Sequence, residues 1–70
     1  MNKKIFHVTA LQEGNYYLIR FPEHPQLFTQ ATHIREVEMM SRDVINLALE
    51  IPLEEIELNI EYLSNVAVTL

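Results

Sequence analysis

The sequence predicts a single α+β domain with the order β-β-β-α-β, in which one helix packs on one face of a mostly antiparallel sheet. Three observations predict this fold class. Two strand-like runs flank Gly14, the only glycine of the chain. Apolar residues then recur at helical spacing over residues 33–50, and apolar and polar residues alternate strictly over residues 55–62. Strands followed by a helix and a further strand favour a sheet with the helix packed across it.

The chain is short, with 70 residues and no cysteine. A chain of this length buries only about 60% of its unfolded surface, so its core is marginal. Disulfides and thiolate metal sites are excluded, and these are common supports of small domains. We therefore expect one domain over residues 1–70, with its core in residues 4–62, that gains further support from self-association or from a partner chain.

The formal net charge of −5 argues against direct binding to nucleic acid. Such binding needs clustered basic side chains, and here the five basic residues are scattered: Lys3, Lys4, Arg20, Arg35 and Arg42. An acidic surface suits a basic protein partner. The alternative is that the acidity only keeps the protein soluble.

The first strand is predicted over residues 4–11, with Phe6, Val8 and Ala10 facing the core. Ile5, His7 and Thr9 line the other face of this strand. Residues 12–15 contain Gly14 and form the turn of a hairpin, because glycine readily adopts positive φ.

The second strand, over residues 16–21, carries apolar groups on both faces, which predicts a central position in the sheet. Tyr17, Ile19 and Phe21 share one face, and Tyr16, Leu18 and Arg20 share the other. Pro22 and Pro25 end the strand because proline has no amide hydrogen to donate. A short third strand is predicted over residues 27–30.

The helix is expected to begin near Thr32, a good N-cap residue, and to end before Pro52. Its broad apolar side comprises Ile34, Val37, Met40, Ser41, Val44, Ile45, Leu47 and Ala48. Leu49 is expected at the edge of that side or outside it. On the opposite side, Glu38 and Arg42 are spaced to form an ion pair.

The last predicted strand spans residues 55–62 and has one wet face. Ile56, Leu58, Ile60 and Tyr62 point one way, and Glu55, Glu57, Asn59 and Glu61 point the other. Three glutamates on one face repel each other, so this strand is expected at a sheet edge or facing a cationic partner. Residues 63–70 are either a tail or an additional strand.

No constellation of residues predicts catalysis, a metal ion or a cofactor. The spacings of His7, His24 and His33 match no compact metal motif. Ser41 lies on the apolar helix side and is expected to donate to a helix carbonyl. A carboxylate cluster is interpreted as a solvated strand face rather than a cation site; it comprises Glu54, Glu55, Glu57 and Glu61. The sequence therefore predicts a protein that is not an enzyme.

No stretch of the sequence has the length and apolarity of a membrane span, and the N-terminal region lacks the apolar core of a signal peptide. A cytoplasmic protein is therefore expected.

The segment from Pro22-Glu23-His24-Pro25 through Leu27-Phe28-Thr29-Gln30 resembles the HicB-like antitoxin family. So does the helix phrase Glu36-Val37-Glu38, Met40 and Arg42-Asp43, followed by Ile51-Pro52. The resemblance covers residues 5–62. It implies a partial RNase H-like fold and a small basic mRNA-cleaving partner, a HicA-like toxin, that the chain occludes by binding.

The sequence departs from the family pattern at Gln26 and Ala31, where glycines are common. Residues 63–70 are also too short for the DNA-binding segment that such antitoxins usually carry, so operator binding is not expected.

Two functions remain open from the sequence. The first is a non-enzymatic, homo-oligomeric interaction module of the antitoxin type. Its predicted partner-binding residues are Tyr16, Tyr17, Glu55, Glu57 and Glu61. The second is a stand-alone protein that binds a small molecule or peptide in a groove beside the turn between Pro22 and Pro25.

Overall fold

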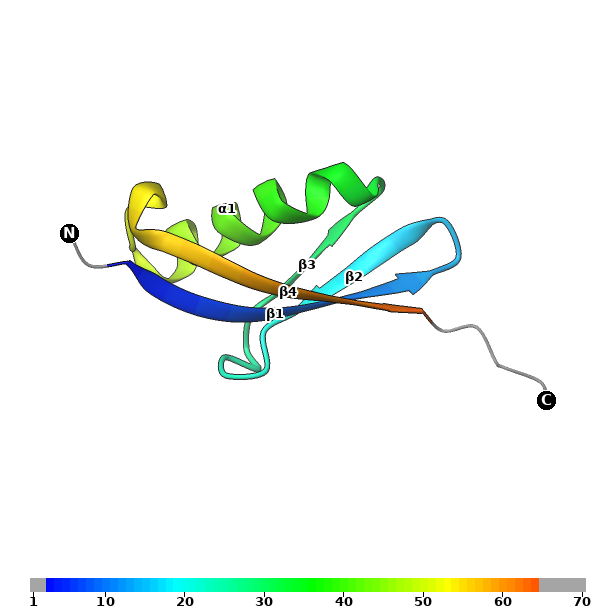
Figure 1. Ribbon diagram of the computed structural model, residues 1–70, viewed down its shortest axis with the longest axis horizontal. Coiled ribbons are helices and arrows are strands. Elements are labelled where there is room, and N and C mark those ends of the chain that lie inside the picture. Colours follow the sequence, from blue (N-terminus) through cyan, green and yellow to red (C-terminus); the bar gives the residue numbers. More distant parts are fainter. Residues whose placement is uncertain (1–2, 65–70) are drawn as a thin grey trace.

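The computed structural model of the protein describes residues 3–64. Its elements are β1 (Lys4–Glu13), β2 (Tyr16–Arg20), β3 (Phe28–Ala31), a 3-10 turn (Ile34–Glu36), α1 (Val37–Leu49), a second 3-10 turn (Leu53–Glu55) and β4 (Ile56–Ser64). The four strands form one mixed sheet in the order β3-β2-β1-β4, with the helix packed along one face (Figure 1). The predicted α+β class and the order β-β-β-α-β are therefore confirmed.

The hairpin of β1 and β2 is built on a two-residue loop, Gly14-Asn15. Glu13 pairs with Tyr16 across it, and Gly14 has a φ of 61°. Positive φ at the first central residue is typical of a type II′ turn, whose twist matches that of the flanking strands. β2 also pairs with β3 in the antiparallel direction, so β2 is central, as predicted.

β4 runs parallel to β1, because the helix carries the chain back along the sheet before β4 begins. The register aligns Phe6 with Leu58 and Val8 with Ile60. β4 is at the edge of the sheet, as predicted. Leu63 and Ser64 extend it, so these two residues belong to β4 rather than to a separate element. Residues 65–70, which complete the predicted tail, lie outside the described residues.

The core lies between α1 and the sheet. β1 contributes Phe6, Val8 and Ala10 to it, as the sequence predicts. The remaining buried apolar residues come from every other part of the fold: Ile19, Phe21, Leu27, Ala31, Val37, Ile45 and Ile56. Ser41 is fully buried among them, and its Oγ donates a hydrogen bond of 2.7 Å to the Val37 carbonyl. The predicted role of this serine is therefore confirmed.

The buried stripe of the helix differs from the predicted one near its C-terminal end. Val37, Ser41 and Ile45 are buried and Leu49 packs against the core, whereas Leu47 is 78% exposed. Ala48 and Ile34 are exposed as well. A row of residues four apart drifts by about 40° per step around a helix of 3.6 residues per turn. The sheet follows that drifting row, so Leu49 takes the place expected for Leu47.

The start of the helical segment also differs from the prediction. Thr32 does not accept a hydrogen bond from a helix amide; instead its hydroxyl donates to the Glu36 carboxylate, with an Oγ1 to Oε1 distance of 3.0 Å. The Thr32 amide donates to the same oxygen at 3.3 Å. Glu36 thus reaches back as the glutamate of a capping box does, but from four residues away rather than three.

This contact gives a testable pH dependence. The hydrogen bond from the Thr32 hydroxyl holds the pKa of Glu36 below its ordinary value of 4.5. A carboxyl whose pKa is lowered on folding stabilises the fold above its unfolded pKa, and that contribution disappears as the pH falls through the folded pKa. We expect Thr32→Val to lower the free energy of unfolding at neutral pH and to have a smaller effect at about pH 3, as measured by urea denaturation.

The matched background for this experiment is Glu36→Gln, which has no ionisable carboxyl at this position. There the effect of Thr32→Val is expected to be the same at both pH values. An effect of Thr32→Val that is as large at acid pH as at neutral pH in the wild-type background would contradict the assignment.

The helix ends at Leu49, and the residue that caps it, Glu50, adopts a left-handed conformation with a φ of 57°. Its amide donates to the Asn46 carbonyl at 3.0 Å, and Asn46 Nδ2 donates to the Ile51 carbonyl at 2.9 Å. The helix therefore ends before Pro52, as predicted. The residue that terminates it is Glu50, two positions before the proline, in a left-handed conformation that is usually adopted by glycine.

Glu50→Gly is expected to raise the free energy of unfolding by about 0.5–1 kcal/mol. A residue with a β-carbon costs about 1–2 kcal/mol in the left-handed region, and the greater entropy loss of glycine offsets part of the gain. Urea denaturation measures the difference. Glu50→Ala is the control, because it removes the same charge but keeps the β-carbon; an equal gain in both variants would assign the effect to charge.

Candidate functional site

The face of the sheet opposite the helix carries the main candidate site, and we call it the open face. Among the described residues, no helix or strand covers it. Alternation along each strand and the register place six large apolar side chains on this face: Ile5, Leu11, Tyr16, Leu18, Phe28 and Leu63. Several are strongly exposed, with Phe28 at 66% and Ile5 at 59%. So many apolar side chains on one face of a small domain are typical of a binding surface.

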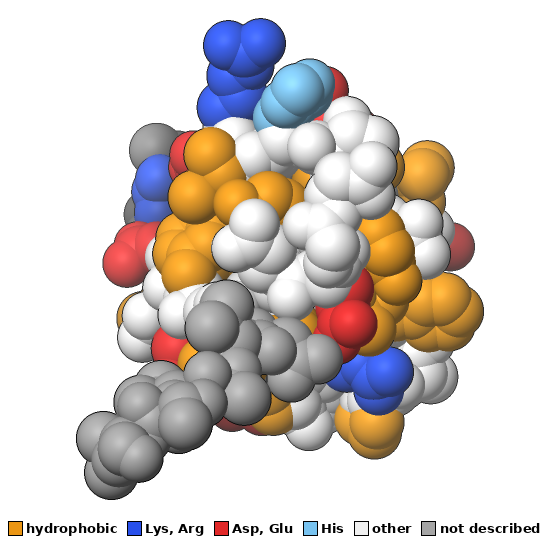
Figure 2. All heavy atoms as spheres, turned by 90° about the vertical axis from the view of Figure 1, so that its right-hand side faces the viewer, with side chains coloured by type: hydrophobic (Ala, Val, Ile, Leu, Met, Phe, Trp, Pro, Cys, Tyr) orange, Lys and Arg blue, Asp and Glu red, His pale blue; other side chains and the backbone are white. Residues whose placement is uncertain are grey.

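The open face also carries acidic side chains along its β4 edge. Glu57 is aligned with Ile5, and Glu61 is aligned with Thr9. Both glutamates are exposed. In the view from the hairpin end, hydrophobic side chains lie beside acidic and basic ones (Figure 2). An apolar surface with an acidic edge favours a partner that presents apolar groups and a basic rim.

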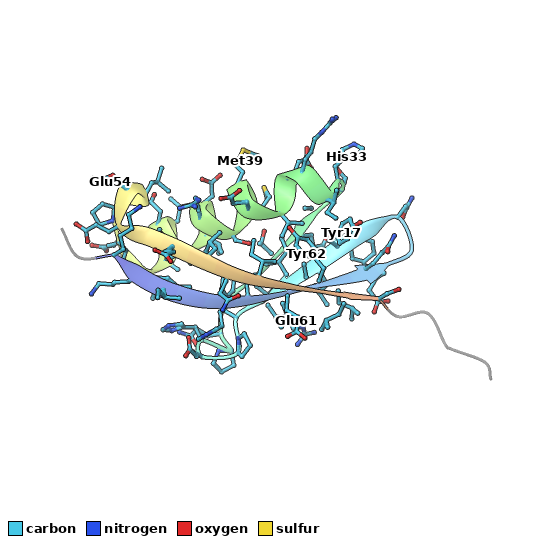
Figure 3. All side chains as sticks on the ribbon, viewed as in Figure 1. Tyr17, His33, Met39, Glu54, Glu61 and Tyr62 are labelled. Atoms are coloured by element: carbon cyan, nitrogen blue, oxygen red, sulfur yellow. The ribbon has the colours of Figure 1, made fainter. Side chains whose placement is uncertain are left out.

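The five predicted partner-binding residues do not form one surface. Tyr16, Glu57 and Glu61 lie on the open face, whereas Tyr17 lies on the helix side, where it is half-buried against the core. Glu55 is in the 3-10 turn before β4. Figure 3 shows Glu61 on one side of the sheet and Tyr17 with Tyr62 on the other.

Tyr17 therefore cannot act together with Tyr16 on one flat partner. The two are adjacent in a strand, and successive side chains of a strand point to opposite faces. The same alternation was visible in the sequence, so the separation of these two tyrosines was available from the pattern of residues 16–21.

A groove of about 570 Å³ lies on the open face where it meets the turn between β2 and β3. Its lining residues come from three strands and the turn: Thr9, Leu18, Arg20, Phe21, Pro22, Pro25, Leu27 and Phe28. The position matches the groove predicted beside Pro22 and Pro25. The sequence did not predict the contributions of Thr9 and Phe28, because these depend on which strands are neighbours.

The rim of the groove is held by two consecutive hydrogen-bonded turns. The His24 amide donates to the Phe21 carbonyl at 2.8 Å, and the Leu27 amide donates to the His24 carbonyl at 2.8 Å. Pro22 and Pro25 each occupy the second position of a turn, where the fixed φ of proline fits. Gln26 avoids positive φ, so this turn forms without the glycine common in the resembled family.

A second hollow adjoins this groove and shares Thr9 and Pro22 with it, and several polar and charged side chains line it. In it, His7 Nδ1 lies 3.2 Å from Glu23 Oε1, and Asn59 and Glu61 complete the β4 side. Between the groove and this hollow, the open face therefore changes from apolar at Phe28 of β3 to acidic at Glu61 of β4. Both side chains of the His7–Glu23 contact are about half exposed, so it contributes little to stability.

Residues 3–64 contain no group of three or more His, Asp or Glu side chains that could hold a metal ion. In that range, no helix is long and apolar enough to cross a membrane.

Comparisons with known proteins returned no matches: no family model fits the sequence, and no curated protein or solved structure is significantly similar to it.

Proposed function

We propose that this protein is a cytoplasmic, non-enzymatic interaction module that binds a basic protein through the open face and the β4 edge. In its specific form it acts as a HicB-type antitoxin, occluding a small basic mRNA-cleaving toxin. One observation supports this most: the uncovered sheet face that combines exposed apolar side chains with Glu57 and Glu61. The apolar groups supply contact area, and the glutamates select a partner of opposite charge.

The proposal predicts that a small basic protein is encoded beside this chain, and the binding test uses that protein as the partner. We expect the double substitution Glu57→Lys and Glu61→Lys to weaken the complex at least about tenfold, because like charges then meet across the interface. Isothermal titration calorimetry measures the affinity. Glu54→Lys is the control, since Glu54 is exposed but lies in the turn before β4, away from the open face (Figure 3).

Equal affinities for the double variant and the Glu54→Lys control would place the interface elsewhere. A pull-down that recovers only the protein itself would refute the antitoxin role.

We also propose that the open face mediates self-association when no partner is bound. The support is again the apolar side chains exposed on this face, namely Ile5, Tyr16, Phe28 and Leu63. Light scattering at micromolar concentration is expected to give a multiple of the 8.2 kDa chain mass. Phe28→Lys, at the most exposed apolar position of this face, should shift the mass towards the monomer; a wild-type monomer would contradict the proposal.

A second candidate function is supported by the groove beside Pro22 and Pro25: a protein that binds a small molecule or peptide. The volume of the groove lies within the range of about 300–1,000 Å³ that is usual for ligand sites. A ligand that binds only the native state raises the melting temperature. A ligand screen without any such rise would argue against this function.

A further inference from the structure

The groove combines apolar walls with one basic side chain, that of Arg20. Leu18 and Phe28 form part of the sheet side, and Pro22 and Pro25 form the rim. The rim is held by backbone hydrogen bonds and by proline, so it requires little ordering when a ligand binds. The groove is therefore already formed in the free protein.

Within residues 3–64, Arg20 is the only basic residue that lines this groove. It pairs with Thr9 on one side and with Phe28 on the other, which places it in the middle of the open face. Among the described residues, its guanidinium forms no ion pair or hydrogen bond, in contrast to that of Arg42, which donates to the Glu38 carboxylate and to the Ile56 carbonyl. A planar guanidinium beside an apolar surface is well suited to a carboxylate attached to an apolar group.

We propose that this groove binds a small monocarboxylate with an aromatic or branched aliphatic body. The carboxylate accepts hydrogen bonds from Arg20, and the apolar body packs between Leu18, Phe28 and the two prolines. This inference rests on the second candidate function, ligand binding in the groove, and specifies the chemical class of the ligand.

The surrounding charges limit the ligand to a single negative charge. Thr9 separates Arg20 from Glu61, because the register aligns Thr9 with both residues. Glu23 lies on the same side, at the His7 end of the adjoining hollow. A second carboxylate on the ligand would lie near these two glutamates, and like charges repel each other. A dicarboxylate therefore binds more weakly than the matching monocarboxylate.

The test uses three probes with the full chain: 4-phenylbutyrate, its uncharged amide and phenylsuccinate, a dicarboxylate of similar size. Amide chemical-shift changes in a two-dimensional NMR titration, up to about 10 mM probe, report both the affinity and the site. For 4-phenylbutyrate, the changes are expected to centre on residues 18–28. The amide is expected to bind at least about tenfold more weakly, as is usual when a charge-assisted hydrogen bond is lost.

Arg20→Gln should reduce the affinity for 4-phenylbutyrate by at least about tenfold and leave the affinity for the amide unchanged. Arg35→Gln removes the same charge outside the groove, in the 3-10 turn before α1, and is expected to leave both affinities unchanged.

The possible failures are distinguishable. If the acid and the amide bind the groove equally, ligand binding stands and the carboxylate preference is wrong. If phenylsuccinate binds as well as 4-phenylbutyrate, the restriction to one charge is wrong. If no probe shifts residues of the groove, both the inference and the ligand-binding function are refuted.

Discussion

Ile45→Ala is expected to lower the free energy of unfolding by about 3 kcal/mol. Ile45 is fully buried between the helix and the sheet. Truncating such a side chain removes its burial and leaves a cavity that the neighbours only partly fill. A domain of this size has a total stability of only about 5 kcal/mol, so the variant should be partly unfolded at moderate temperature. Urea denaturation followed by circular dichroism measures the loss.

Leu47→Ala is the matched control for that experiment. It truncates a side chain of the same volume class two residues further along the same helix, but this side chain is 78% exposed. We expect a change within about 0.5 kcal/mol. A large loss in Leu47→Ala, together with a small one in Ile45→Ala, would mean that a different face of the helix packs on the sheet.

Arg42→Met is expected to cost about 1–2 kcal/mol, through the loss of a contact between the helix and β4. The Arg42 guanidinium donates both to the Glu38 carboxylate, at 2.9 Å, and to the backbone carbonyl of Ile56, the first residue of β4. Met keeps most of the apolar stem and removes the donors. A hydrogen bond from a charged group contributes about 1.5–3 kcal/mol, and partial exposure reduces this figure.

Glu38→Gln separates the two contacts of Arg42. The ion pair is exposed on the Glu38 side, at 61%, and exposed pairs spaced four residues apart contribute only about 0.3–0.5 kcal/mol. We therefore expect Glu38→Gln to cost much less than Arg42→Met in the same denaturation experiment. Equal losses would assign the stabilisation to the ion pair, and the bond to Ile56 would then contribute nothing measurable.

Arg42 makes one contact within the helix, to Glu38, and one contact to Ile56, the first residue of β4. The sequence predicted the Glu38–Arg42 pair, and the structure contains it. The same spacing carries no information about the Ile56 carbonyl, which lies fourteen residues further along the chain. Arg42 thus has a local role that its spacing from Glu38 reveals and a tertiary role that depends on where β4 packs.

The open face likewise combines features that local sequence patterns predict with features that depend on the tertiary structure. Alternation along residues 16–21 and 55–62 was sufficient to place Tyr16 apart from Tyr17 and to group Glu57 with Glu61. The neighbours of these residues could not be predicted. Leu18, Phe28 and Thr9 line the same groove only because β2 lies between β3 and β1 in the sheet.

The sequence by itself determined the α+β class, the order of the elements, the hairpin at Gly14 and the apolar face of β1. These features follow from local periodicity and from residues with special backbone conformations, which act within a few positions of the chain. Only the tertiary structure decided the parallel pairing of β4 with β1, the packing of Leu49 against the core in place of Leu47 and the position of Arg20 in an apolar groove. These features depend on contacts between residues far apart in the chain, where the twist of the sheet and the drift of the helix stripe decide which side chains meet.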